Sequence, residues 1–183
     1  MVRLLRLDRN LLTVYLVALL ALFLLPISGP QFSLLDIESD KWTHVGLFAG
    51  LCMLVRWNLE SIPWATLISV AATVMFAAAI EGIQSLLAYR SAEWADLLAG
   101  SVGALLGVAV TNRVLSSSAP DKPFGILIII LGIMAGVISA LADVIGVSRQ
   151  DQFGPYQLAG IVLGVVIVAG GIRVYKKGWH VSP

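Results

Sequence analysis

Six apolar stretches, separated by short polar segments, are the feature that most constrains how this sequence can fold. They cover residues 10–27, 42–57, 62–89, 94–115, 124–147 and 155–175. A helix needs about 20 predominantly apolar residues to cross the hydrocarbon core of a bilayer, and each stretch approaches or exceeds this length. The chain is 58% hydrophobic and 13% charged, whereas soluble domains carry roughly 25% charged residues. We therefore expect an all-α integral membrane protein that forms a bundle of six transmembrane helices.

Turn-forming residues separate these stretches and divide the chain into two parts. Pro26 lies at the end of the first stretch and Pro30 just after it, Pro63 lies at the start of the third, and Pro155 opens the last. A polar run with two prolines at 116–123 separates the fourth stretch from the fifth. We therefore predict a four-helix membrane domain at 1–117 and a C-terminal transmembrane hairpin at 118–183. The third helix, over 62–89, is expected to be long enough to tilt, and the second to extend at one end.

The distribution of Lys and Arg predicts that both ends of the chain are cytoplasmic. Cytoplasmic loops of membrane proteins carry an excess of these residues. With the N-terminus inside, the inner segments hold Arg3, Arg6, Arg9, Arg56, Arg113, Lys122, Arg173, Lys176 and Lys177, and the outer segments hold only Lys41, Arg90 and Arg149. The net charge is +1, which gives no reason to expect a nucleic-acid partner. The single Cys52 excludes an internal disulfide.

Small residues recur every four positions in the last three stretches. They are Ala99, Gly103 and Gly107 in the fourth, Gly132 and Gly136 in the fifth, and Gly160 and Gly164 in the sixth. Small residues at this spacing allow helix backbones to approach closely in a membrane. The pattern predicts tight packing, either within this chain or against other membrane subunits.

Polar residues inside the predicted spans concentrate at their outer ends. The candidate binding residues are Asp40, Lys41, His44, Glu81, Gln84, Arg90 and Asp96. Ionisable residues in a membrane are costly and usually face the bundle interior or a wet cavity. On a helix that continues to Tyr89, Glu81 lies about 12 Å below the outer end, so its carboxylate needs partners. We expect one polar network centred on Glu81, with His44 and Arg90 as the available partners.

Simpler roles remain open for several of these residues. Asp40 and Asp96 lie where helix N-caps belong, and a carboxylate there also suits the helix dipole. His44 can be an interfacial residue that bonds to a loop, and Arg90 can be a solvated loop charge. Glu81 is the residue that neither a cap nor an interfacial position explains.

The order of these residues resembles a known family. Asp40-Lys41-Trp42-Thr43-His44 begins one predicted helix, Glu81-Gly82-Ile83-Gln84 lies in the next, and Arg90 and Asp96 precede Gly100, Gly103 and Gly107. The combination is similar to the VanZ-like family of bacterial membrane proteins over residues 1–117. That family shows an Asp-Lys-x-x-His start, a Glu-x-x-Gln pair, an Arg, and an Asp followed by spaced glycines. It commonly has an Asn about four residues after the Asp, where this chain has Ala99-Gly100.

The resemblance implies a multi-pass protein of the bacterial cytoplasmic (inner) membrane. The founding member of the family gives resistance to teicoplanin, so a role in glycopeptide tolerance is one expectation. We expect a non-catalytic outer-face site that binds a lipid head group or a lipid-linked envelope precursor. Lys41 and Arg90 would meet phosphate or carboxylate, and Glu81, Gln84 and Asp96 would accept bonds from hydroxyl or amide donors.

Two alternative functions remain open at this point. One is an accessory or assembly subunit of a larger membrane protein complex, which would dock through the Gly and Ala helix faces. The other is an intramembrane enzyme in which Glu81 and His44 exchange a proton. The sequence holds no nucleophile motif, metal-ligand spacing or glycine-rich phosphate loop. We therefore favour a non-catalytic protein and expect no cofactor and no metal.

Overall fold

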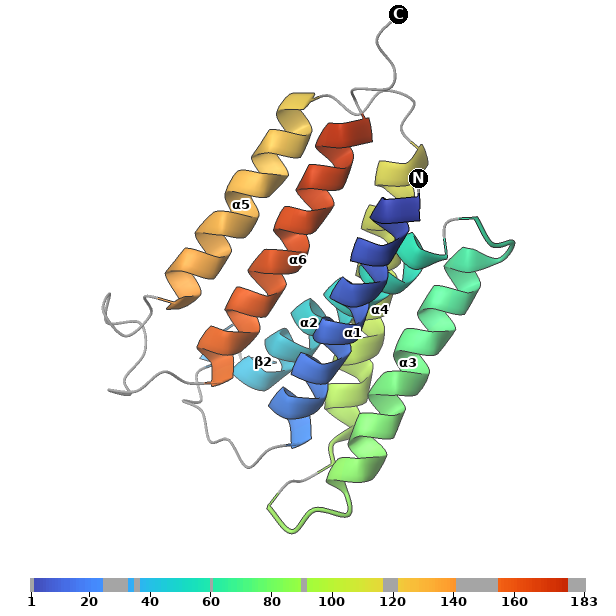
Figure 1. Ribbon diagram of the computed structural model, residues 1–183. Coiled ribbons are helices and arrows are strands. Elements are labelled where there is room, and N and C mark those ends of the chain that lie inside the picture. The colour runs from blue at the N-terminus through green and yellow to red at the C-terminus, as the bar shows by residue number, and fades with distance from the viewer. Residues whose placement is uncertain are drawn as a thin grey trace, which may run out of the picture. The chain divides into compact units, whose positions relative to one another are not determined.

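Helices make up almost all of the regular structure. The computed structural model describes residues 2–24, 33–34, 37–59, 61–89, 92–116, 122–140 and 155–177. Its helices are α1 (Val2–Leu24), α2 (Ser39–Asn58), α3 (Ala65–Gln84), α4 (Trp94–Ser116), α5 (Lys122–Ala140) and α6 (Pro155–Lys177) (Figure 1). Two short antiparallel strands, β1 (Ser33–Leu34) and β2 (Ile37–Glu38), precede α2, with Ser33 opposite Glu38. The prediction of a helical fold is confirmed.

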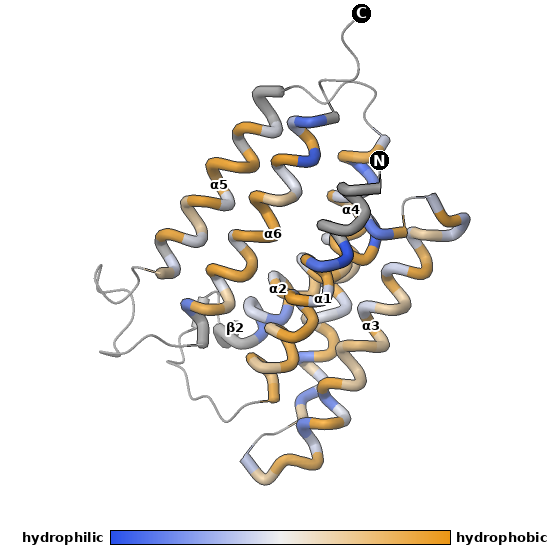
Figure 2. The backbone as a smooth tube through the Cα atoms, viewed as in Figure 1, coloured by the Kyte–Doolittle hydropathy of each residue, from blue (hydrophilic) through white to orange (hydrophobic). Residues whose placement is uncertain are grey.

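Three helices are long and apolar enough to cross a membrane. They cover Ala65–Gln84, Trp94–Ser116 and Gln157–Lys176. Shorter apolar helical segments cover Arg9–Leu24 and Ile128–Val137. Hydrophobic residues extend along most of each helix, and hydrophilic residues gather towards helix ends (Figure 2). Length and composition of these helices therefore indicate a membrane protein.

Helix α3 is shorter than its apolar stretch. Trp64 precedes it with φ 65, and the helix begins at Ala65 and ends at Gln84. Beyond that end, the N–H of Leu86 donates to the Ile83 carbonyl at 3.0 Å, which closes a turn. The prediction of a helix over 62–89 is wrong, because apolar residues suit a turn in an apolar environment as well as they suit a helix. Glu81 therefore lies in the last turn of α3, and the predicted depth of about 12 Å does not hold.

Two aspartates expected at N-caps lie inside their helices. Asp40 is the second residue of α2, which begins at Ser39. Asp96 is the third residue of α4, and its N–H donates to the Glu93 carbonyl at 3.0 Å. The cap positions are therefore wrong by one or two residues. A carboxylate in the first turn still interacts favourably with the positive end of the helix dipole, as Asp96 does.

The chain forms two compact units, Met1–Thr111 and Asn112–Pro183. The division falls inside α4, a few residues before the predicted boundary after residue 117. The first unit contains α1 to α3 and most of α4, and the second contains the α5–α6 hairpin.

Helix α2 is the centre of the first unit. Both α1 and α3 pack against it and against each other, and the hydroxyl of Tyr15 in α1 donates to the Leu47 carbonyl of α2 at 2.8 Å. Helix α4 approaches α2 through its glycines. A Cβ atom at Gly103 would overlap the Val45 carbonyl oxygen and lie 3.0 Å from the Ala49 nitrogen. The predicted close contact is therefore made within this chain.

The second unit is an antiparallel hairpin whose helices also approach through glycines. A Cβ atom at Gly164 would lie 2.7 Å from the carbonyl oxygen of Gly132 and 2.9 Å from the nitrogen of Gly136. One at Gly125 would lie 2.7 Å from the nitrogen of Tyr175. The glycines of α5 and α6 thus bring the two backbones together, as their spacing predicts.

Candidate functional site

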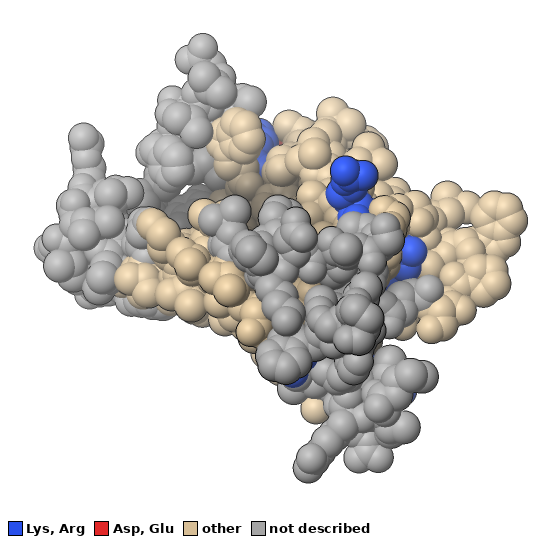
Figure 3. Space-filling model, turned by 90° about the horizontal axis from the view of Figure 1, so that it is seen from above, with Lys and Arg blue, Asp and Glu red and all other residues tan. Residues whose placement is uncertain are grey.

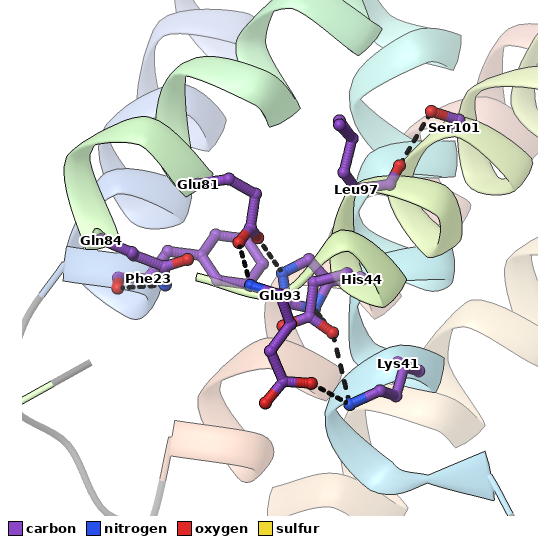
Figure 4. Close-up of polar contacts among 9 residues, drawn as sticks. Phe23, Lys41, His44, Glu81, Gln84, Glu93, Leu97 and Ser101 are labelled. Atoms are coloured by element: carbon purple, nitrogen blue, oxygen red, sulfur yellow. Dashed lines mark hydrogen bonds and ion pairs between the residues drawn. The ribbon is translucent and has the colours of Figure 1, made fainter. Parts of the chain in front are cut away.

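Four helix ends meet at one end of the first unit. Because successive helices alternate in direction, α1 and α3 end where α2 and α4 begin. These ends bring together five residues that we call the polar cluster: Lys41, His44, Glu81, Glu93 and Asp96 (Figure 4). Residues far apart in sequence therefore form one site.

His44 lies between two carboxylates. Its Nε2 is 3.6 Å from Glu81 Oε1, and its Nδ1 is 3.9 Å from Asp96 Oδ1. The exposed fractions are 5% for His44, 9% for Glu81 and 7% for Asp96. These separations are longer than ordinary hydrogen bonds, and a small shift of the side chains would close either one. The imidazole can therefore interact with either carboxylate.

Aromatic rings hold the imidazole in place. The ring of Phe23 in α1 lies 4.6 Å from that of His44, measured between centroids, and the ring of Phe48 lies 5.8 Å from it on the same helix. Phe48 in turn contacts Gly100 of α4, where a Cβ atom would lie 3.1 Å from the ring. The apolar side of the site is thus built from α1, α2 and α4.

Glu81 has one carboxylate oxygen fixed by the backbone. The N–H of Glu93 donates to Glu81 Oε2 at 3.0 Å. This bond joins the last turn of α3 to the segment just before α4. It orients the carboxylate so that Oε1 faces His44 (Figure 4).

Lys41 balances only part of the negative charge in the polar cluster. Its ammonium lies 2.9 Å from Glu93 Oε2 and 3.6 Å from Asp96 Oδ1. Glu93 is the most open member, with a side chain that is 44% exposed. Among the five residues of the polar cluster, three carboxylates face one lysine and one histidine. Carboxylates accept hydrogen bonds from donors and attract cations.

Gln84 lies beside the polar cluster and presents an acceptor to it. Its Nε2 donates to the Phe23 carbonyl at 2.9 Å, which ties the end of α3 to the end of α1. Its Oε1 is buried and has no hydrogen-bond partner among the residues that the structure describes. In Figure 4 this oxygen points away from the Phe23 carbonyl and toward the side of the cluster.

The structure brings together Lys41, His44, Glu81 and Asp96 of the predicted binding residues, with Gln84 next to them. Arg90 lies outside the described residues, as does the side chain of Asp40. Of the two partners expected for Glu81, His44 lies 3.6 Å from its carboxylate, and the pairing with Arg90 falls outside the described residues. The Glu93 backbone N–H is an additional partner that was not expected.

Sequence reasoning missed Glu93 and Phe23 as members of the site. Glu93 had one available signal, since it lies three residues before Asp96 and immediately before the start of α4. No sequence signal identified Phe23, because the contact of its ring with His44 and the hydrogen bond from Gln84 to its carbonyl both depend on how α1 packs.

No family model, curated protein or solved structure matches this chain. The fold and the site define a helical protein with membrane-spanning character and a buried imidazole–carboxylate cluster at one end of its first unit. The chemistry of that cluster is the basis for assigning a function.

Proposed function

We propose that this chain is a six-span protein of the bacterial cytoplasmic (inner) membrane with both ends in the cytoplasm. The positions of two basic residues support this orientation. Arg56 lies in the last turn of α2 and Arg113 in the last turn of α4, each at the opposite end of its helix from the residue that it contributes to the polar cluster. Figure 3 views the molecule from the end at which α1 begins, where Lys and Arg are visible and no described Asp or Glu is. The positive-inside rule then places the polar cluster at the outer face.

The polar cluster is the binding site for the head group of a membrane lipid or of a lipid-linked envelope precursor. One observation carries this proposal: buried carboxylates from α3 and α4 lie on two sides of His44, where α3 ends and α2 and α4 begin. Lys41 is already engaged by Glu93 and Asp96, so a bare phosphate gains little there. Carboxylates and the Gln84 amide oxygen instead accept bonds from hydroxyl, amine or amide groups. The site therefore selects head groups rich in donors.

The resemblance to the VanZ-like family supports an envelope role, including glycopeptide tolerance. Several of the described residues that carry the resemblance lie close together in the first unit. Asp96, Gly100, Gly103 and Gly107 occupy one buried face of α4, and that face packs on the helix that carries Lys41 and His44. Such an arrangement gives the pattern a structural reason, because the spaced glycines position the aspartate.

The test compares two lipids whose head groups share a phosphate but differ in hydrogen-bond donors. Phosphatidylethanolamine has an ammonium with N–H donors, and phosphatidylcholine has none. The protein is purified in mild detergent from vesicles of equal composition, and the retained lipid is measured by mass spectrometry. We expect enrichment of phosphatidylethanolamine in the wild type and loss of that enrichment in Glu81→Gln. Arg113→Gln, in the last turn of α4 and far along that helix from Asp96, is the matched control. Equal retention of both lipids by the wild type would refute the proposal.

A further inference from the structure

We infer that His44, Glu81 and Asp96 form a binding site for one divalent transition-metal ion, with Zn²⁺ the best fit. One ligand atom from each of the three residues lies within 4.8 Å of those from the other two, and all three residues are buried. They come from α2, α3 and α4, so no local spacing in the sequence reveals them. The sequence therefore contains no local metal-binding motif for this site.

The separations fit a zinc site after a small adjustment. Zinc bonds to histidine nitrogen and carboxylate oxygen are about 2.0–2.2 Å long, which places tetrahedral ligand atoms about 3.4 Å apart. His44 Nε2 and Glu81 Oε1 are 3.6 Å apart. Asp96 Oδ1 lies 3.9 Å from Nδ1, the other ring nitrogen, so an ion on Nε2 requires the Asp96 carboxylate to move toward Glu81. The three ligand atoms already lie within 4.8 Å of one another, and side-chain rotation supplies the movement. Three protein ligands leave a fourth position open for water or a head-group oxygen.

The surroundings supply what a metal site requires beyond its ligands. The Glu93 N–H holds Glu81 Oε2 at 3.0 Å, which orients the other oxygen for the ion. Metal ligands are commonly fixed by such outer hydrogen bonds. The Gln84 oxygen is an independent sign of a missing ligand. Gln84 is 4% exposed and its Oε1 lacks a hydrogen-bond partner in the described part of the chain, and a water bound to the ion would donate to it.

The identity of the ligands favours zinc over magnesium. Imidazole is a good ligand for Zn²⁺, whereas Mg²⁺ prefers oxygen and keeps several waters. Lys41 opposes binding, because its ammonium lies 3.6 Å from Asp96 Oδ1 and repels a dication. Removing this charge should therefore tighten metal binding, which a purely structural cluster would not show.

The experiment uses the full chain in nanodiscs, stripped of metal with a chelator and dialysed. Zn²⁺ alone is added in competition with a chromophoric chelator, and bound metal is counted by mass spectrometry. We expect one Zn²⁺ per chain. His44→Gln and Asp96→Asn should each weaken the affinity by at least about tenfold, and Lys41→Met should strengthen it several-fold. Ser101→Ala is the control, since its hydroxyl bonds only to the Leu97 carbonyl one turn back on α4.

Two results would overturn the inference. One is the absence of stoichiometric Zn²⁺ at millimolar concentration in the folded wild type. The other is an affinity that His44→Gln and Asp96→Asn leave unchanged. Where a variant fails to fold, Co²⁺ added to the wild type decides instead, since tetrahedral nitrogen–oxygen ligation gives intense visible absorption. Failure here is separable from failure of the lipid proposal, because repeating the lipid experiment with chelator present measures the lipid preference without metal.

Discussion

Gly103 and Gly82 differ in their surroundings so sharply that the same substitution should have opposite effects. Both lie inside helices, Gly103 in α4 and Gly82 in α3. A Cβ atom at Gly103 would overlap the Val45 carbonyl oxygen, whereas one at Gly82 meets nothing within 4 Å. Alanine is the better helix former by about 0.5–1 kcal/mol, so Gly82→Ala should be neutral or stabilising by up to that amount.

Gly103→Ala gains the same stability from helix propensity but loses more through steric overlap. The added methyl meets backbone atoms of α2, which cannot move aside as a flexible side chain can, so α2 and α4 must separate. Overpacking of this kind costs about 1–3 kcal/mol. The expected net change is therefore a destabilisation of about 0.5–2 kcal/mol, and the two variants should differ by about 1–3 kcal/mol.

The free energy of unfolding is measured in micelles by tryptophan fluorescence during denaturant titration, with both variants and the wild type in the same detergent. The reasoning fails if Gly103→Ala is as stable as Gly82→Ala. That outcome would mean that α4 does not approach α2 through this face.

Three further predictions follow from particular contacts. Glu81→Gln should keep the fold, because its amide oxygen still accepts the Glu93 N–H. Glu81→Ala leaves that N–H without its acceptor and should lower the free energy of unfolding by about 1–3 kcal/mol. Equal stability of the two variants would contradict this. Tyr15→Phe should cost about 1 kcal/mol in the same titration, since the bond to Leu47 is buried. A membrane-impermeant thiol reagent should label Glu38→Cys but not Ser117→Cys in intact cells, and labelling of the second would reverse the proposed orientation.

Much of the helical framework could be predicted from hydropathy, and its limits have a physical cause. Apolar runs of sufficient length predict the helices, and the glycine spacing predicts the close faces of α4, α5 and α6. Periodicity could not locate the end of α3, since the residues from Ser85 onward are as apolar as those before Gln84. Hydrogen bonds in the turn, rather than composition, decide where that helix stops.

The sequence could predict some of the residues that form the site, but it could not predict which residue pairs with Lys41. Alternating helix direction places His44, Glu81 and Asp96 at one end, which sequence order alone implies. The partner of Lys41 depends on how the backbone enters α4, and there Glu93 takes the ammonium at 2.9 Å. Lys41, which was expected to meet an anion, is therefore paired with a carboxylate of the chain itself, whereas Arg90 lies outside the described residues.

The glycines that pack α4 against α2 also determine the geometry of the polar cluster. Asp96, Gly100, Gly103 and Gly107 share the buried face of α4, so the distance between α2 and α4 also sets the distance between Asp96 and His44. At present Asp96 Oδ1 is 3.9 Å from His44 Nδ1. A methyl group at Gly103 that separates the helices should draw Asp96 away from the imidazole. Gly103→Ala should therefore weaken Zn²⁺ binding although no ligand has changed, and Gly82→Ala should leave it as it was.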